Sequence, residues 1–177
     1  MRCPPRSANF SRSAIVPSDP HESVYVTQSA EETIARGREL AAAMNPPLLV
    51  LLSGELGAGK TTLAKGIISA LGAAREEAVT SPTFTLVHVF HGASHTAPAG
   101  APRDTSRKPA KVYHADLYRI ENFHDLESLG LEDALTESAI LIVEWSEKFR
   151  LPSDWPRVEI SLEHLGSDAR RITVRTP

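Results

Sequence analysis

Two continuous apolar runs stand out along the chain. Residues 48–52 (Leu-Leu-Val-Leu-Leu) and residues 139–143 (Ala-Ile-Leu-Ile-Val) contain no polar side chain. Such runs are typical of strands that are buried on both faces of a parallel sheet. After the first run, Leu63, Ile67 and Leu71 recur at helical spacing, which predicts a helix that packs one face on that sheet. A strand, a turn and a helix in this order indicate an α/β fold.

Shorter patterns predict further elements on both sides of these runs. Ser29 to Glu32 has the form of a capping box and opens a helix, which Asn45-Pro46-Pro47 stops. We expect one face of this helix to carry Ile34, Gly37, Leu40, Ala41 and Met44. A further, short helix is predicted over residues 123–131, ended by a glycine. Other β-prone stretches are residues 24–26, 86–90, 112–115, 158–162 and 172–174.

The last two of these stretches alternate apolar and polar residues around a Gly166-Ser167-Asp168 turn, and this pattern predicts a C-terminal β-hairpin. We expect the hairpin to pair antiparallel with the edge of the sheet. The sequence assigns no chemistry to it.

Two segments lack any periodic pattern. Residues 1–22 are rich in Arg, Ser and Pro at their start, which loosely suggests a transit peptide. The clustered prolines argue against the amphipathic helix of such a peptide, so we favour a disordered extension or an upstream start codon. Residues 91–110 are rich in Ala, Pro, Ser, Thr and Gly and predict a flexible insertion. Residues 23–177 are then expected to form a single domain.

Composition limits the class of protein. A chain of 177 residues with 41% hydrophobic residues can bury a core without cross-links. The single cysteine, Cys3, excludes an internal disulfide. A net charge of −3 gives no positive field that would hold nucleic acid without a partner. No apolar run is as long as a membrane span, and we expect a soluble, cytoplasmic protein.

Candidate chemistry begins between the first apolar run and the helix that follows it. Residues 54–61, Gly-Glu-Leu-Gly-Ala-Gly-Lys-Thr, fit the phosphate-binding pattern G-x-x-x-x-G-K-[ST] at every fixed position. The alternative is a glycine-rich turn that binds nothing. In a nucleotide site, the backbone N–H groups would surround phosphate oxygens. Lys60 would reach the β- and γ-phosphates, and the Thr61 hydroxyl would hold Mg²⁺.

Two carboxylates come at the ends of predicted strands, which is where open α/β sheets bind ligands. Glu144 closes the second apolar run, and Asp116 ends the strand over residues 112–115. An acid after four apolar residues is typical of the second nucleotide-binding motif, which directs a carboxylate at Mg²⁺. The alternative for each is a helix cap or a solvated strand end. The hydroxyl-rich residues 80–85 fit a nucleotide switch or an ordinary polar turn equally well.

These patterns predict a P-loop NTPase fold: a mainly parallel central sheet flanked by helices, with antiparallel edge strands and a C-terminal β-hairpin. The motifs themselves indicate a Mg²⁺-dependent nucleoside triphosphatase or a kinase. Neither a guanine-binding N/T-K-x-D motif nor a D-x-x-G motif is present, so a GTPase is not expected. A small-molecule kinase with Asp116 as its base, and an adaptor that binds nucleotide without hydrolysis, stay open.

Four blocks in this order resemble the TsaE family, the bacterial ATPases required for threonylcarbamoyladenosine on tRNA. The resemblance runs from about Val24 to the C-terminus. It does not extend to the N-terminal extension or to the insertion over 91–110. The blocks are Gly-Glu-Leu-Gly-Ala-Gly-Lys-Thr-Thr (54–62), Ser-Pro-Thr-Phe-Thr-Leu-Val (81–87), Val-Tyr-His-Ala-Asp-Leu-Tyr-Arg (112–119) and Ile-Val-Glu-Trp (142–145).

The resemblance implies ATP and Mg²⁺ as cofactors. Thr61 and Glu144 would hold Mg²⁺, and Asp116 would take part in hydrolysis together with Lys60 and Glu144. Trp145 would lie near the nucleotide, and residues around Ala30 would contact the adenine. The ATP phosphates would be bound by Gly57, Ala58, Gly59, Lys60, Thr61 and Thr62.

The resemblance also implies partners. In the family the protein joins the TsaB–TsaD pair, and TsaD transfers the threonylcarbamoyl group to adenosine, so contact with tRNA is indirect. ATP hydrolysis would reset that complex between turnovers. No arginine finger is clear, and Arg119 is the nearest candidate, so we expect slow hydrolysis alone. The oligomeric state is not determined by the sequence; we expect a monomer when the protein is free.

Overall fold

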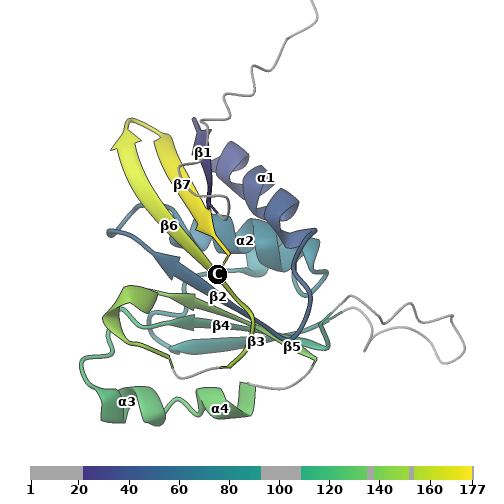
Figure 1. Ribbon diagram of the computed structural model, residues 1–177, viewed down its shortest axis with the longest axis vertical. Coiled ribbons are helices and arrows are strands. Elements are labelled where there is room, and N and C mark those ends of the chain that lie inside the picture. Colours follow the sequence, from purple (N-terminus) through teal and green to yellow (C-terminus); the bar gives the residue numbers. More distant parts are fainter. Residues whose placement is uncertain (1–21, 93–108, 135–137, 152–153, 177) are drawn as a thin grey trace, which may run out of the picture.

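The computed structural model describes residues 22–92, 109–134, 138–151 and 154–176. In this part of the chain, one sheet has the strand order β1-β7-β6-β2-β5-β4-β3 (Figure 1). Neighbours among β6, β2, β5 and β4 are parallel, and the pairs β1–β7, β7–β6 and β3–β4 are antiparallel. The strands are β1 (Glu22–Thr27), β2 (Leu48–Ser53), β3 (Val87–His91), β4 (Lys111–Asp116), β5 (Ala139–Glu144), β6 (Arg157–Gly166) and β7 (Ala169–Arg175).

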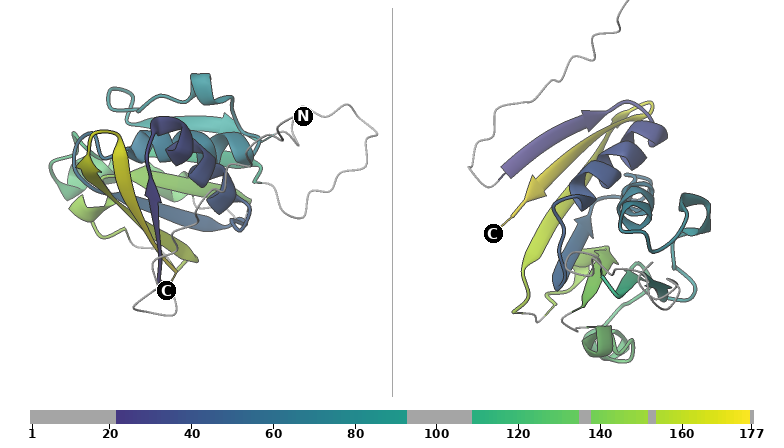
Figure 2. Two further views of the ribbon diagram at one scale, coloured as in Figure 1. Left: turned by 90° about the horizontal axis from the view of Figure 1, so that it is seen from above. Right: turned by 90° about the vertical axis from the view of Figure 1, so that its right-hand side faces the viewer.

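Helices cover both faces of the sheet. The helices α1 (Ala30–Ala41) and α2 (Lys60–Ala70) lie side by side on one face (Figure 2). The short helices α3 (Phe123–Glu127) and α4 (Leu131–Ala134) pack on the other face, against β4 and β5. The 3₁₀ turns η1 (Glu76–Ala78) and η3 (Ser146–Lys148) follow α2 and β5. No helix among the described residues is long and apolar enough to cross a membrane.

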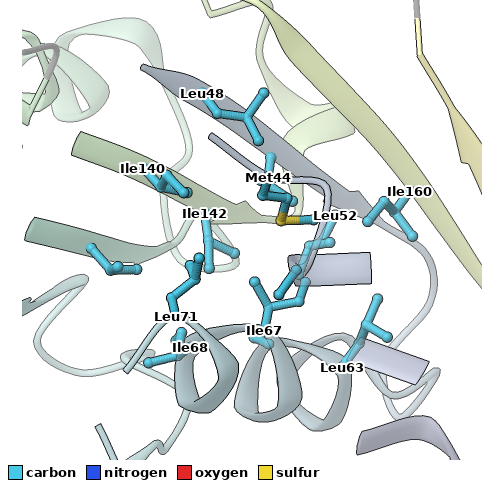
Figure 3. Packing of buried hydrophobic residues seen from close by; sticks show 14 of the residues in the cluster. Met44, Leu48, Leu52, Leu63, Ile67, Ile68, Leu71, Ile140, Ile142 and Ile160 are labelled. Atoms are coloured by element: carbon cyan, nitrogen blue, oxygen red, sulfur yellow. The ribbon is translucent and has the colours of Figure 1, made fainter. Parts of the chain in front are cut away.

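This layered arrangement explains the two apolar runs. Alternate residues of a strand point to opposite faces of a sheet, and in β2 and β5 both faces are covered. Leu52 and Ile142 pack with Ile67 of α2 (Figure 3). Leu49 and Leu141 pack in a separate cluster with residues of α3 and α4. Strand β5 is buried along its whole length, and the prediction of a doubly covered parallel sheet is confirmed.

The two large helices approach each other so closely that glycine is required at their contact. An added Cβ on Gly66 would lie 2.0 Å from the carbonyl oxygen of Ile34, and one on Gly37 would lie 2.4 Å from that of Leu63. Real Cβ atoms essentially never come this close to another heavy atom. The backbone of α2 is therefore held against that of α1, which fixes the position of the α2 N-terminus.

The first helix begins as its capping box predicts and ends earlier than expected. The Ser29 hydroxyl accepts from the Glu32 N–H at 3.1 Å, while the Glu32 carboxylate accepts from the Gln28 N–H rather than from that of Ser29. The helix ends at Ala41, and Met44 reaches the core from the turn after it. The predicted strands over 24–26, 48–52, 86–90, 112–115 and 139–143 are confirmed, with ends shifted by at most two residues.

The pairing predicted for the C-terminal hairpin is wrong. The hairpin itself forms, but β6 pairs parallel with β2 in the interior of the sheet. Strand β6 begins beside the amino end of β2, where Arg157 pairs with Leu49, so β6 runs in the same direction as β2. Strand β1 then completes the edge beyond β7.

Most of the two aperiodic segments lies outside the described residues. This holds for 1–21 and for 93–108, and β1 begins one residue before the predicted boundary. The flanks of the insertion are ordered, because the Gly92 N–H donates to the carbonyl of Ala110 at 3.0 Å. That pair lies at the amino end of β4, and Asp116 lies at the opposite end of the strand.

Candidate functional site

The phosphate-binding pattern forms a loop between β2 and the N-terminus of α2. Gly59 caps α2 with φ of +103°, a left-handed conformation that glycine adopts without strain. Gly57 also has positive φ and is exposed, whereas Ala58 is buried and donates its N–H to the carbonyl of Glu55. Thr62 lies in the first turn of α2. The loop is thus the strand–turn–helix unit that anion binding at a helix N-terminus requires.

Thr61 and Glu144 converge although they are far apart in the sequence. Parallel pairing of β2 with β5 places Leu52 opposite Glu144, at the carboxyl end of both strands. The Thr61 hydroxyl donates to Glu144 Oε2 at 2.9 Å. Glu144 is 2% exposed, so this carboxylate is oriented by protein contacts rather than by water. The structure thus brings together the two side chains predicted to hold Mg²⁺.

Lys60 is folded against its own loop. Its Nζ donates to the carbonyls of Gly54 and Glu55 at 2.6 and 2.9 Å, and it lies 3.7 Å from the centre of the Trp145 ring. Burial lowers the pKa of Lys60, and the nearby carboxylates of Glu144, Glu147 and Asp116 oppose that shift. The charged ammonium is poorly solvated here, so a bound anion would stabilise it.

Trp145 is placed over the loop by an unusual backbone conformation. It follows Glu144 directly and has φ of +60°, a region that costs a non-glycine residue about 1–3 kcal/mol and occurs mainly at functional sites. Its ring lies 5.0 Å from that of Tyr118. Trp145 therefore lies beside Lys60 of the phosphate-binding loop, and its contact with a nucleotide stays a prediction.

Asp116 anchors the hydroxyl-rich loop over residues 80–85. Its Oδ2 accepts from the hydroxyls of Ser81 and Thr83, and its Oδ1 accepts from the Tyr118 N–H at 2.9 Å. Asp116 is also the register neighbour of Glu144 on β5. The loop, Asp116 and Glu144 thus meet at one edge of the sheet. Whether the loop acts as a switch stays a prediction.

The segment after Asp116 is held by Lys148 of η3, a contact that the sequence did not indicate. The Lys148 ammonium donates to the carbonyls of Leu117, Tyr118 and Ile120. Nearby, the Arg119 guanidinium lies 4.2 Å from the centre of the Phe84 ring. Lys148 therefore connects the end of β5 to the segment that carries Tyr118 and Arg119.

Replacing Lys148 by methionine removes these three hydrogen bonds and keeps the length of the side chain. Lys148 is largely exposed, so we expect the free energy of unfolding to fall by only about 1–2 kcal/mol. Hydrogen exchange should become faster in peptides that cover residues 117–120. The matched control is Lys65→Met on α2, for which these peptides should keep their exchange rates. Unchanged exchange in Lys148→Met would contradict this anchoring role.

The C-terminal hairpin lies against the phosphate-binding loop, which the sequence did not predict. An added Cβ on Gly54 would lie 2.2 Å from the Leu162 carbonyl oxygen, and one on Gly59 would lie 3.4 Å from Arg170 Nε. Arg170 pairs in register with Thr27, just before the start of α1. It thus brings a positive charge to the side of the loop that faces α1. Residues two apart in a strand share one face, and Ile172 of β7 is buried. This spacing was the one signal in the sequence that Arg170 lies on the face of the sheet that the helices cover.

The sequence also missed His114. Its ring is fully buried and lies 2.8 Å from Glu144 through Nε2. His114 precedes Asp116 by two residues in β4, and side chains at that spacing share one face of a strand.

The sheet, the loop and the carboxylate at the end of β5 define a protein with the P-loop NTPase fold. Residues 27–172 match the family model described as "Threonylcarbamoyl adenosine biosynthesis protein TsaE". The chain therefore belongs to the TsaE family, whose role is in tRNA threonylcarbamoyladenosine biosynthesis.

Individual relatives agree with this assignment. The chain is 34% identical over 151 residues to the TsaE protein of Treponema pallidum, covering 84% of this chain and 97% of the relative. It is 33% identical over 147 residues to that of Bacillus subtilis, covering 83% and 81%. The fold is similar to the crystal structure of B. subtilis YdiB, with a TM-score of 0.61, 29% identity, and coverage of 88% of this chain and 85% of that one.

Proposed function

We propose that the protein is a Mg²⁺-dependent ATPase that acts on the TsaB–TsaD complex and sustains its turnover in tRNA modification. The observation that carries this proposal is the convergence of Lys60, Thr61 and Glu144 at the N-terminus of α2. A lysine, a hydroxyl and a carboxylate around a backbone turn are the groups that P-loop enzymes use for a triphosphate and its metal.

The oxygen atoms that Thr61 and Glu144 offer fit Mg²⁺. No three His, Cys, Asp or Glu side chains gather into a metal site within the described ranges, so a metal here would take its other ligands from phosphate and water. Mg²⁺ characteristically binds in this way, through one or two protein oxygens. Thr61 and Glu144 would supply those oxygens, and the bound ion would neutralise charge on the transferred phosphoryl group.

The other residues take complementary roles in this proposal. The backbone of Gly57–Thr62 binds the phosphates, and the Lys60 ammonium moves from its loop carbonyls to the phosphate oxygens. Arg170 adds a second cation beside Gly59, and the start of α1 lies on the adenine side. Asp116 keeps the hydroxyls of residues 80–85 in position, from which they order the attacking water.

We expect slow hydrolysis by the isolated protein. Arg119 lies over the Phe84 ring, which is 83% exposed, and both belong to segments that a partner can contact. Binding of TsaB–TsaD would complete the site and accelerate hydrolysis. The net charge of −3 suits a protein whose partners supply the contact with tRNA. We propose a cytoplasmic location for this work.

The test is an ATPase assay with γ-labelled ATP and Mg²⁺, with and without the TsaB–TsaD complex. We expect slow release of phosphate to water, at least tenfold faster with the complex, together with ATP-dependent co-purification of the three proteins. Transfer of the label to a metabolite would favour a kinase, and binding without turnover in every mixture would favour an adaptor. Failure to associate under any nucleotide condition would overturn the proposed partners.

A further inference from the structure

We infer that His114 is a positioning residue for Glu144: it fixes the carboxylate so that one oxygen stays available for Mg²⁺. This inference rests on the proposed function in one respect, that Glu144 binds the metal. His114 lies in the middle of β4 and is 0% exposed. Histidine is usually found at least partly exposed, so a fully buried ring that contacts the carboxylate calls for a physical explanation.

The two oxygens of Glu144 have different partners. Oε1 lies 2.8 Å from His114 Nε2, and Oε2 accepts from the Thr61 hydroxyl at 2.9 Å. The Thr61 side therefore faces the phosphate-binding loop, and the His114 side faces the core. With each oxygen held by a separate element, the carboxylate can neither rotate nor withdraw into the sheet.

The surroundings of the ring determine which nitrogen carries the proton. Among the described residues, His114 Nδ1 has no hydrogen-bond partner. A proton on Nδ1 would leave a buried donor unpaired and would turn the lone pair of Nε2 towards a carboxylate. Both arrangements are unfavourable. The structure therefore favours a proton on Nε2, donated to Glu144.

Loss of this donor would leave Oε1 of Glu144 without its partner in a buried site. The side chain would then turn or shift to regain a hydrogen bond, and Oε2 would leave the Thr61 side. Groups that orient a metal ligand in this way typically contribute 10–100-fold to metal affinity. Binding of the phosphates themselves should not change, because Lys60 hydrogen-bonds carbonyls of its own loop, whereas His114 hydrogen-bonds Glu144.

The test compares two amides at this position. In His114→Gln the amide nitrogen is as many bonds from the backbone as Nε2, so it can still donate to Glu144. In His114→Asn it is one bond shorter and cannot reach. Val112→Ala is the control for packing, since Val112 is fully buried on the same face of β4, two residues away. ATP affinity is measured by calorimetry with Mg²⁺ and again in EDTA.

In His114→Asn, we expect the Mg²⁺ concentration that gives half of the full Mg²⁺-dependent gain in ATP affinity to rise 10–100-fold. In EDTA, the ATP affinity of this variant should stay within twofold of that of the unmodified protein. His114→Gln should stay within about threefold of the unmodified protein in both conditions. Val112→Ala should lower the melting temperature and leave the Mg²⁺ dependence as it was. A folded His114→Asn with normal Mg²⁺ dependence, or equal defects in both amide variants, would overturn the inference.

A second measurement observes the protonated nitrogen of His114 directly in the unmodified protein, and a substitution serves only to assign the signal. In the unmodified protein with ¹⁵N-labelled histidine, NMR should show His114 with its proton on Nε2, and this signal should shift when Mg²⁺ joins bound ATP. The signal is assigned by its loss in His114→Gln. A proton on Nδ1 would overturn the inference. Because the protonated nitrogen is observable without nucleotide, absence of Mg·ATP binding would refute the proposed function and still leave this result interpretable.

Discussion

Replacing Lys60 by alanine is expected to weaken Mg·ATP binding by about two to four orders of magnitude. The ammonium would contact two phosphate groups, and each charge-assisted hydrogen bond contributes about 1.5–3 kcal/mol, where about 1.4 kcal/mol is a factor of ten in the dissociation constant. Calorimetric titration with Mg·ATP measures the effect. Hydrolysis should fall below detection at ATP concentrations that saturate the unmodified protein.

Folding should change little in Lys60→Ala, which separates loss of binding from loss of structure. Burial already lowers the pKa of Lys60, so the charge itself does not favour the folded state, and its removal offsets the loss of two hydrogen bonds to loop carbonyls. The matched control is Lys65→Ala, which removes the same charge from a position further along α2. Wild-type ATP affinity in Lys60→Ala would exclude the loop as the phosphate site.

The second large effect is expected on stability. In Gly66→Ala, the new methyl group would lie 2.0 Å from the Ile34 carbonyl oxygen, so α1 and α2 must move apart. Overpacking of a core costs about 1–3 kcal/mol and occasionally more, and backbone atoms on both sides place this case at the upper end. The gain of about 1 kcal/mol in helix propensity is too small to compensate.

Thermal unfolding is the measurement for this variant. A net loss of about 2 kcal/mol corresponds to a melting temperature lower by about 4–8 °C in a chain of this size. Lys65→Ala, on the neighbouring position of α2, should melt within about a degree of the unmodified protein. A stabilised Gly66→Ala variant would show that the two helices are not held in backbone contact.

The sequence predicted the structure correctly where a feature is contained in one short stretch of residues. The loop over 54–61 and the strands beside it are each contained in one short stretch, so their pattern predicts both the fold class and the position of the site. Glu144 could be paired with Thr61 because the ends of parallel strands meet at one edge.

What the sequence did not show depends on contacts between distant segments. The direction of β6 depends on which end of β2 its first residue pairs with, and the sequence pattern of β6 itself carries no signal for that. His114 looks like any polar residue in a half-buried strand until β5 is placed beside it. Gly66 resembles a weak point of a helix, and only the backbone of α1 opposite it explains the residue. The direction of β6, the contact of His114 and the need for glycine at position 66 each depend on how two separate elements pack against each other.

The place of the hairpin has a consequence for synthesis of the chain on the ribosome. Strand β1 is made before the other strands of the sheet, yet its neighbour is β7, whose residues emerge after those of the other strands. The close contact between the Leu162 carbonyl and Gly54 also forms only after β6 has been synthesised. A nascent chain that ends before β6 therefore lacks one side of the phosphate-binding loop, and nucleotide capture should become possible only after β6 and β7 have left the ribosome.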